Sequence, residues 1–541
     1  MSAQRSEGGR DMDADYVVIG AGSAGCVVAS RLSETGARVV LLEAGPRDWH
    51  PWIHIPAGIL KLLYNPLVNY NYGSQPEPGT AGRSIHWPRG RVLGGSSSIN
   101  GMLYVRGNPA DFDGWAQMGC RGWSFEDVLP YFKQSEHYVS GDGPYRGKGG
   151  PLQVEDYRTI LPLTHRFIEA AQQAGFTFRK DLNGEQQEGV GYSQMTRLGR
   201  FRGSTARTFL AAAKGRANLR VETNAVATRL LFEGRRCVGV AFRQGSQNRE
   251  LRVTREVILS GGSVNSPHLL QVSGIGPAEH LQSIGVPVLH ELSGVGANLQ
   301  DHYVARVAHR VRQARSINEL SRGLRLAGEV ARFAVQGRGA LTFGVTSAQV
   351  FCRSRPELAS PDLQLLFTPA SYDPAKFGAL EHEPGMTVAI CPVRPDSRGT
   401  IMAVAADPLV RPVIRPNYLS DPNDQRVLNA GIRLTRQIFA APAIAQHSVE
   451  EMVPGPGVST DEALAEYCRG YGTTIFHPVG TCRMGDGTNA VVDSRLRVHG
   501  IGGLRVIDAS VMPTLTTGNT NAPTIMIGEK GAAMIREDAA A

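Results

Sequence analysis

The chain has 541 residues, more than one hydrophobic core usually holds, and 42% of them are apolar, so two large globular domains are expected. The net charge of +8 is modest for this length and gives no indication of nucleic-acid binding. No run of 18 apolar residues occurs, so no membrane-spanning helix is expected. The polar first fifteen residues lack the apolar centre of a signal peptide, and the seven cysteines are widely spaced, so we expect reduced thiols and a cytoplasmic location.

The first unit predicted along the chain is a strand, a helix and a second strand. Residues 16–19 are typical of a buried strand, residues 26–32 of a helix, and residues 38–42 of a strand that ends at Glu43. The glycines of residues 20–25 allow a tight turn, and the helix N-terminus offers unpaired N–H groups to a pyrophosphate. Glu43 can accept hydrogen bonds from ribose hydroxyls and would repel a 2′-phosphate. This βαβ unit predicts a dinucleotide site and disfavours NADP.

Two later segments repeat the transition from a strand to glycines or to an acid. Residues 257–262 are typical of a strand followed by glycines, and Ser266 is expected to open a helix. Residues 503–508 are a short strand ending in an aspartate, and Asn521 is expected to cap a helix whose first turn holds Pro523. These features suit the ribityl chain and pyrimidine end of a flavin. The sequence thus predicts one dinucleotide domain assembled from separate segments.

Residues 474–485, TIFHPVGTCRMG, are too irregular for a helix or strand and too rich in reactive side chains for a spacer. From these residues alone, His477 is a catalytic base, a metal ligand together with Cys482, or a hydrogen-bonded ring that fills a turn. Pro478 and Gly480 favour a turn that presents the imidazole. Two ligands without a neighbouring third argue against a metal, and no metal site is expected. A nucleophilic pair of Cys482 and His477 is not indicated either, because their spacing of five residues in an irregular segment is no evidence that the two side chains are in contact.

The chain resembles the glucose–methanol–choline (GMC) flavin oxidoreductases over nearly its whole length. One family signature is matched by residues 90–100 and continues through Tyr104, Gly107 and Asp113, and a second is matched by residues 262–276. Within the family the chain is most similar to bacterial choline-dehydrogenase-like enzymes that oxidise primary alcohols, some of them membrane-associated. The resemblance implies FAD, an alcohol substrate, an aldehyde product, and a quinone, a dye or oxygen as electron acceptor. It leaves two alternatives. One is a hydroxynitrile lyase that keeps the fold and FAD without net redox chemistry, and the other is a non-enzymatic flavoprotein, against which the pair of His477 and Asn521 argues.

The resemblance also implies which residues form the site. Catalysis is assigned to His477, as the base for the hydroxyl proton, and to Asn521, which would hold the alcohol oxygen. Some relatives attach FAD through a histidine at the position of Ile99, so FAD is expected to bind here without a covalent bond. The remaining histidines, His302 among them, are expected to be structural or surface groups. The FAD-binding residues implied are Gly20, Gly22, Ser23, Ala24, Gly25, Glu43, Ala44, Arg91, Gly94, Gly95, Ser96, Asn100, Val226, Asp508, Ala509, Asn519, Pro523 and Thr524.

The expected fold class is α/β, mixed α+β overall, with a discontinuous Rossmann-like FAD-binding domain and a substrate domain built on an antiparallel sheet. Alternating apolar residues in 362–367 and 399–404 suit a half-exposed antiparallel sheet. The aromatic and proline-rich residues 49–72 either cover the substrate entrance or pack on the surface. The FAD-binding domain is assigned residues 13–153, 200–305 and 478–541, and the substrate domain residues 154–199 and 306–477.

Residues 306–338 contain eight arginines and two acids. Helical periodicity places apolar residues, including Leu324 and Val330, on one side, with Arg325 and Arg332 mostly on the other. The favoured interpretation is a surface helix whose apolar side packs in the protein core. The alternative is a helix lying on an anionic membrane surface, which would give a peripheral membrane contact near quinone.

Overall fold

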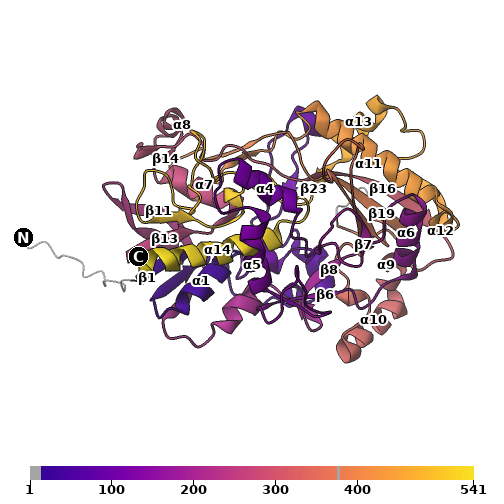
Figure 1. Cartoon of the computed structure of the whole chain (residues 1–541), viewed down its shortest axis with the longest axis horizontal. Coiled ribbons are helices and arrows are strands. Elements are labelled where there is room, and N and C mark those ends of the chain that lie inside the picture. Colours follow the sequence, from indigo (N-terminus) through magenta and orange to yellow (C-terminus); the bar gives the residue numbers. More distant parts are fainter. Residues whose placement is uncertain (1–13, 374–377) are drawn as a thin grey trace, which may run out of the picture.

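The structure, a computed structural model, describes residues 14–373 and 378–541, so the predicted domain boundary at residue 13 and most of the polar N-terminus lie outside the described residues. Two seven-stranded sheets dominate this part of the chain. Figure 1 shows the first sheet with α1 and α14 on the left and the second sheet with α6, α11 and α12 on the right. This mixed α/β architecture is the predicted fold class.

The first sheet has the strand order β10-β2-β1-β13-β12-β11, with β24 beside β13. β10, β2, β1, β13 and β24 run parallel, whereas β11, β12 and the first part of β13 form an antiparallel meander. The parallel part is the Rossmann-like unit that the separate segments predict. The bounds are β1 (Ala14–Ile19), β2 (Val39–Leu42), β10 (Leu219–Glu222), β11 (Ala225–Glu233), β12 (Arg236–Gln244), β13 (Gln247–Leu259) and β24 (Leu504–Val506).

Three helices begin at the carboxyl ends of the parallel strands: α1 (Gly25–Ser33), α7 (Gly262–Val272) and α14 (Asn521–Ala540). α7 begins at Gly262 and not at Ser266, so that prediction is wrong, and Pro267 lies inside the helix. Because proline cannot donate to the carbonyl four residues back, the Ser263 carbonyl needs another donor. The Thr481 hydroxyl supplies it at 2.7 Å, which stabilises a helix that the sequence pattern argues against.

The second sheet has the order β22-β16-β19-β18-β17-β7, with β23 pairing with β16, and all its pairings are antiparallel. Every residue of β17 and β18 is buried, so the expectation of a half-exposed sheet is wrong for residues 362–367. The other predicted segment, residues 399–404, contains β20 (Thr400–Met402), which has alternating burial and pairs with β21 (Val413–Arg415) in a separate two-stranded antiparallel sheet. Helices α6 and α11 pack on this sheet, while alternate residues of its strands face a cavity. The bounds are β7 (Gly189–Tyr192), β16 (Tyr303–Val311), β17 (Ala348–Cys352), β18 (Leu363–Thr368), β19 (Gly385–Pro392), β22 (Ser448–Val453), β23 (Thr473–Thr474), α6 (Pro162–Gln173) and α11 (Pro422–Ala440).

The other elements are shorter or lie at the periphery. They are α2 (Pro51–His54), η1 (Pro56–Gly58), α3 (Ile59–Leu62), β3 (Tyr72–Gly73), η2 (Pro78–Thr80), β4 (His86–Trp87), η3 (Gly95–Ser98), α4 (Pro109–Gln117), α5 (Phe125–Ser135), β5 (Glu136–Tyr138), β6 (Leu152–Asp156), β8 (Gln194–Leu198), β9 (Phe201–Arg202), η4 (Ala206–Leu210), β14 (Ile275–Gly276), α8 (Ala278–Ser283), β15 (His290–Glu291), α9 (Ile317–Leu320), α10 (Gly323–Gln336), η5 (Ala340–Thr342), β20 (Thr400–Met402), β21 (Val413–Arg415), α12 (Pro442–Ala445), α13 (Asp461–Tyr471) and η6 (Ala509–Val511).

The strands of the two sheets fall largely into the two sets of predicted segments. β16 departs from this pattern because it begins at Tyr303, ahead of the boundary at 305/306, and β6 crosses the boundary at 153/154. The division into domains therefore stays a prediction. All seven cysteines lie in the described part of the chain, where each is buried and none is bonded to another. Among the helices of residues 14–373 and 378–541, none has the length and apolar character needed to cross a bilayer.

Candidate active site

A cavity of about 1010 Å³ lies between the two sheets. On one side it is lined by the loops that follow β1, β2, β13 and β24, at the carboxyl ends of the parallel strands. Open parallel sheets characteristically bind ligands at this edge. On the other side it is lined by the inner faces of β16, β18 and β19. The cavity thus joins the predicted dinucleotide site to the antiparallel sheet.

The glycines after β1 shape the first end of the cavity. Gly20 has a φ of +99°, and a Cβ there would lie 2.4 Å from the Ser260 carbonyl oxygen. A Cβ on Gly25 would lie 1.8 Å from the Gly20 carbonyl oxygen, so this glycine lets the helix approach the strand. A Cβ on Gly22 would meet nothing within 4 Å, and Gly22 lines the cavity. The N-terminus of α1 has no side-chain cap, which leaves N–H groups for a phosphate and fits the pyrophosphate of a dinucleotide.

Glu43 lies at the end of β2, buried in the lining of the same end. Its carboxylate accepts hydrogen bonds from the backbone N–H groups of Ala21, at 3.0 Å, and Gly45, at 2.8 Å. Burial raises the pKa of Glu43 to about 7, although these two N–H groups lower it. A carboxylate accepts about four hydrogen bonds in all, so Glu43 keeps acceptor capacity for ribose hydroxyls.

Most of the predicted FAD-binding residues line this cavity, including Ser23, Ala24, Ala44, Arg91, Gly95, Ser96, Asn100, Val226, Asp508, Ala509, Asn519 and Thr524. Gly25, Gly94 and Pro523 do not line it. Gly25 packs against the strand, as described above. Gly94 forms a turn with a φ of +86°, and Pro523 is buried in the first turn of α14. These three residues contribute to the shape of the site from behind its surface.

Asp508 joins two of the loops that line the cavity. Its Oδ2 accepts hydrogen bonds from the Gly262 N–H, at 2.8 Å, and the Ser266 hydroxyl, at 2.6 Å. Its Oδ1 accepts from the backbone N–H and the hydroxyl of Ser510. Burial raises the pKa of this carboxyl, and all four hydrogen bonds oppose that rise. Asp508 therefore fixes the N-terminus of α7 against the end of β24.

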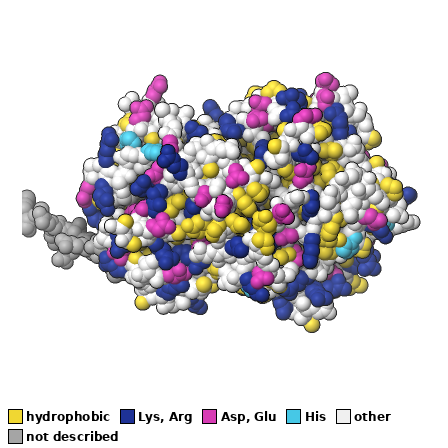
Figure 2. All heavy atoms as spheres, viewed as in Figure 1, with side chains coloured by type: hydrophobic (Ala, Val, Ile, Leu, Met, Phe, Trp, Pro, Cys, Tyr) yellow, Lys and Arg dark blue, Asp and Glu magenta, His cyan; other side chains and the backbone are white. Residues whose placement is uncertain are grey.

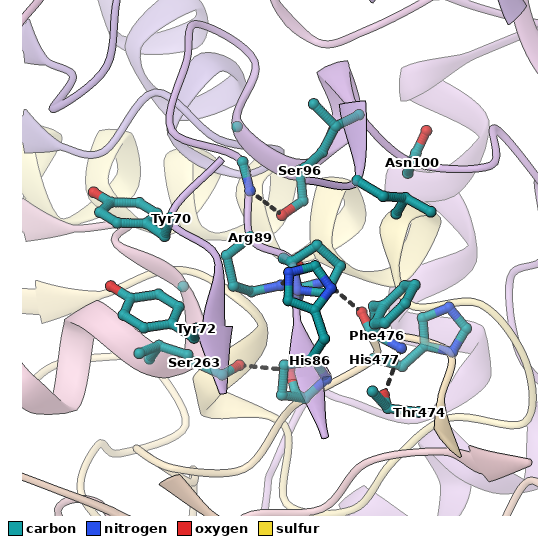
Figure 3. Close-up of a pocket in the computed structure, with 18 of the residues that line it drawn as sticks. Tyr70, Tyr72, His86, Arg89, Ser96, Asn100, Ser263, Thr474, Phe476 and His477 are labelled. Atoms are coloured by element: carbon teal, nitrogen blue, oxygen red, sulfur yellow. Dashed lines mark hydrogen bonds between the residues drawn. The ribbon is translucent and has the colours of Figure 1, made fainter. Parts of the chain in front are cut away.

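His477 projects from the irregular segment after β23 and lines the cavity next to Phe476 and Thr474 (Figure 3). Asp301 holds this segment, because it accepts hydrogen bonds from the His477 N–H, at 2.7 Å, and the Thr474 hydroxyl, at 2.5 Å. Arg89 donates to the Phe476 carbonyl at 2.6 Å, and Phe476 has a φ of +72°. These contacts fix the backbone of His477 in a conformation that an isolated turn would not keep.

A chain of hydrogen bonds determines the tautomer of His477. His302 Nε2 lies 3.2 Å from the Val393 carbonyl oxygen, which only accepts, so Nε2 carries the proton. Burial lowers the pKa of His302 to about 4, so its Nδ1 is a bare acceptor. His477 Nδ1 lies 2.8 Å from that nitrogen and must donate. Because burial, His302 and Arg89 lower the pKa of His477 well below its ordinary value, the ring is neutral and its Nε2 carries no proton, so that its lone pair can accept the hydrogen bond from Asn519.

Asn519, and not Asn521, lies beside this lone pair. The Asn519 Nδ2 is 3.1 Å from His477 Nε2, while Asn519 Oδ1 is buried and has no partner in the described structure. Asn521 is the first residue of α14, which Thr520 precedes as N-cap, so the predicted cap is wrong. The Asn521 Oδ1 accepts a hydrogen bond from the Ser23 hydroxyl at 2.8 Å, on the loop after β1. The structure thus pairs His477 with Asn519 and connects Asn521 to the dinucleotide end.

Sequence reasoning missed several residues of the site. His302 was expected to be a structural or surface group, yet it contacts His477, and no local pattern around it indicates this. Asn519 belongs to the same short motif as Asn521, and it is Asn519 that hydrogen-bonds His477 in the structure. Residues 49–72 contain α2, η1 and α3, and they line the cavity through Ile59, Leu60, Leu63, Tyr64, Tyr70 and Tyr72. Cys482 does not line the cavity.

Comparison with known proteins agrees with this site. The GMC oxidoreductase family profiles match residues 14–304 and 395–528. The chain is 43% identical to an alcohol dehydrogenase (acceptor) of Pseudomonas putida, covering 96% of this chain and 95% of that protein. It is 41% identical to the mitochondrial choline dehydrogenase of Homo sapiens, covering 96% and 89% respectively. The structure superposes on pyridoxine 4-oxidase from Mesorbium loti with a TM-score of 0.89 at 29% identity, covering 97% of this chain and 99% of that one.

The fold and the site define a flavin-dependent oxidoreductase of the kind that acts on CH–OH donors. The chain belongs to the GMC oxidoreductase family. The structure also resembles a formate oxidase of Aspergillus oryzae, with a TM-score of 0.91 at 26% identity over 98% of this chain and 99% of that one. FAD is the cofactor of this family, and nothing in these comparisons favours the hydroxynitrile lyase alternative.

Proposed function

We propose that the protein oxidises a primary alcohol to an aldehyde with His477 as the base and Asn519 as its partner. The observation that carries this proposal is the tautomer of His477, whose bare Nε2 lines the cavity. An alkoxide donates hydride more readily than an alcohol, so a base at the hydroxyl proton accelerates the oxidation. The earlier assignment of Asn521 to this role is replaced by Asn519, which the hydrogen bonding favours.

His477, His302 and Asn519 have different roles in the proposed reaction. The bound FAD supplies the acceptor for the hydride. His477 Nε2 accepts the hydroxyl proton, and the hydrogen bond from Nδ1 to His302 keeps the ring in the orientation that presents Nε2. In the structure Asn519 Nδ2 donates one N–H to His477 Nε2, so the alcohol hydroxyl would displace this hydrogen bond, and the Asn519 amide could then donate to the alcohol oxygen. This pair therefore binds the oxygen and removes its proton, which orients the carbon for hydride loss.

The FAD contacts are part of the same proposal. Gly20, Gly22 and the N-terminus of α1 would hold the pyrophosphate, and Glu43 the adenosine ribose. Ile99 has no group that bonds covalently to a flavin, which supports non-covalent FAD. The electron acceptor is a quinone, a dye or oxygen, and the expected location is the cytoplasm.

We infer that the substrate is an uncharged alcohol and not a quaternary ammonium alcohol. The inner face of the antiparallel sheet lines the cavity with Ala308, Leu366 and Ala389. Two aromatic side chains of the cavity lining, Tyr372 and Tyr467, lie beside Arg306, so these rings are already close to a cation. A second cation brought to these rings would be repelled.

Anaerobic flavin reduction tests both parts of the proposal. The purified holoenzyme is mixed without oxygen with a series of uncharged primary alcohols and, separately, with choline, and the flavin absorbance is followed. Bleaching by an uncharged primary alcohol with formation of the aldehyde is the expected result. If none of the alcohols bleaches the flavin, the proposed function is wrong. If choline reduces it faster than every uncharged alcohol, only the inference about substrate charge is wrong.

A further inference from the structure

α10 presents its apolar side to solvent and not to the core. The side chain of Leu324 is 93% exposed and that of Val335 is 79% exposed. Only Glu329 and Phe333 of this helix are buried. The expectation that the apolar side packs in the protein core is therefore wrong for Leu324 and Val330, although Phe333 is buried, and the polar Glu329 also faces the protein.

The direction in which the apolar residues point follows from the helical repeat. Successive residues of an α-helix are about 100° apart, so Glu329 and Phe333 define the inner side of α10. The direction opposite to them is occupied by Leu324, Ala331 and Val335, all exposed. The small and apolar residues between them complete one continuous stripe along the helix. This stripe points straight away from the body of the protein.

Specific contacts hold α10 in this orientation. Glu329 Oε2 accepts a hydrogen bond from the Ala340 N–H at 2.6 Å. The ring of Phe333 packs edge-on against Phe201, with 6.0 Å between the ring centroids. Arg200 donates to the Phe333 carbonyl at 3.1 Å, which pairs a cation with the negative end of the helix. The exposed stripe thus belongs to an anchored helix, and not to one that has failed to dock on its own protein.

Net positive charge lies beside the stripe. Arg325 and Arg332 border one side of it with side chains that are 59% and 52% exposed, and they pair with Glu319 at 2.9 Å and Glu329 at 3.2 Å respectively. Figure 2 shows basic side chains gathered at the lower right of the molecule, where Figure 1 places α10. Five arginines and two glutamates lie in or beside the helix: Arg200, Arg322, Arg325, Arg332, Arg338, Glu319 and Glu329.

We propose that α10 docks onto an anionic lipid surface, with its apolar stripe in the interface and its arginines against the headgroups. A helix with an apolar face and basic flanks is suited to this position. A second copy of the chain fits less well. The helix has 14 residues, so its outer side is only about 21 Å long and about 10 Å wide, far less than the roughly 800 Å² that each partner contributes to a standard protein interface. Paired copies would also bring arginine flanks together.

Vesicle flotation of the holoenzyme tests the apolar stripe. The vesicles contain phosphatidylcholine either alone or mixed with phosphatidylglycerol. We expect binding to the mixed vesicles only, and binding that weakens as salt rises. The double variant Leu324→Asp with Val335→Asp should lose at least about tenfold in affinity. The control Met118→Asp, at an exposed apolar side chain at the end of α4, should bind like the parent protein, and all variants should keep alcohol-driven flavin reduction.

A second pair of variants tests the charge. Arg325→Gln with Arg332→Gln should reduce binding roughly 25-fold, since each basic residue near such a surface contributes about fivefold. Arg252→Gln with Arg497→Gln removes the same net charge from side chains of similar exposure and should leave binding nearly unchanged.

Three results would overturn the proposal. One is that the parent protein fails to bind mixed vesicles at low salt, and another is that the two arginine pairs lose affinity equally. The third is that the parent protein self-associates in sedimentation velocity without lipid, while the Leu324 and Val335 double variant is monomeric. In that case the stripe is an interface between copies of the chain.

Discussion

His302 is the residue that sets the proton on His477, although it does not line the cavity. A neutral imidazole has two tautomers, and only the one with a bare Nε2 can accept the proton of an alcohol in the cavity. The Val393 carbonyl fixes the first proton of the chain, and His302 transmits the choice to His477. Catalytic competence therefore depends on a backbone carbonyl just after β19 as well as on the base itself.

Replacing His302 tests this arrangement. His302→Phe removes the acceptor for His477 Nδ1 and should slow flavin reduction by about 10–100-fold, the usual loss when a partner that fixes a histidine is removed. Because His302 also lowers the pKa of His477, its loss should move the acidic limb of the rate to higher pH. An asparagine at this position would restore an acceptor, so His302→Asn should recover part of the rate. Two results together would show that His302 has a merely structural role. They are an acidic limb of the pH–rate profile that stays at the parental pH in His302→Phe, and equal rates of flavin reduction in His302→Phe and His302→Asn.

The two asparagines near the start of α14 should give different phenotypes. Asn519→Ala should slow flavin reduction with FAD still bound, because Asn519 contacts His477. Asn521→Ala should weaken FAD binding more than it slows reduction in the FAD-saturated enzyme, because Asn521 contacts Ser23 on the loop after β1. Flavin content and the rate of anaerobic reduction are measured on both variants. The opposite pattern would restore Asn521 as the partner of the base.

At the scale of single elements, local sequence patterns predicted the structure correctly where backbone geometry requires particular residues. The glycines of residues 20–25 and the acid after β2 predicted the βαβ unit because tight turns and close packing require them. The prediction of where α7 begins was wrong because the hydrogen-bond donor that replaces the missing N–H of Pro267 is the Thr481 hydroxyl, far along the chain. The prediction of how α10 is oriented was wrong for a related reason. Periodicity identifies an apolar side, but the contacts of Glu329 and Phe333 decide which side faces the protein.

A buried ion cluster holds the short strand β5 in place. Glu136 is fully buried and accepts from Arg106 at 2.6 Å and from the Gly147 N–H at 2.7 Å, and it also pairs with Arg146. Removing one partner of a buried ion pair leaves the other charge uncompensated. Such a cluster is invisible in the local sequence because its members come from separate segments of the chain.

Neutralising this cluster should destabilise the fold. Glu136→Gln should lower the free energy of unfolding by about 3–5 kcal/mol, because Arg106 keeps its charge in a buried position. The matched control Glu233→Gln breaks the exposed pair with Arg252 and should change stability by less than about 1 kcal/mol. Chemical denaturation of both holoenzymes provides the comparison. Equal midpoints for the two variants would contradict the energetic role given to burial.

At the scale of the whole molecule, the two sheets meet across one cavity, and segments distant in sequence line it together. The sequence predicted the parallel sheet, the antiparallel sheet and many of the residues that line the cavity. It did not predict that β17 and β18 of the antiparallel sheet are buried on both faces, because the elements that cover them come from other segments. The sequence also did not predict the contact between His302 and His477, because this contact depends on how the start of β16 pairs with β23.

The attachment of FAD is a property of the assembled site. Ile99 is buried and lines the cavity, but its side chain has no nucleophile. Acid precipitation of the holoenzyme should leave all the flavin in the supernatant, whereas flavin retained in the pellet would reveal a covalent bond. Removing FAD should also lower the midpoint of thermal unfolding in proportion to its binding, because a ligand that binds only the folded state stabilises it.

The most direct test of the account is the anaerobic reduction of flavin by a primary alcohol in His477→Ala. The variant should retain FAD, since His477 contacts His302 and Asn519 and none of the phosphate-binding loops. With its base removed, flavin reduction should slow by about 10²–10⁴-fold relative to the parent enzyme under the same conditions. Flavin reduction at the parental rate in an FAD-loaded His477→Ala variant would contradict the assignment of His477 as the base.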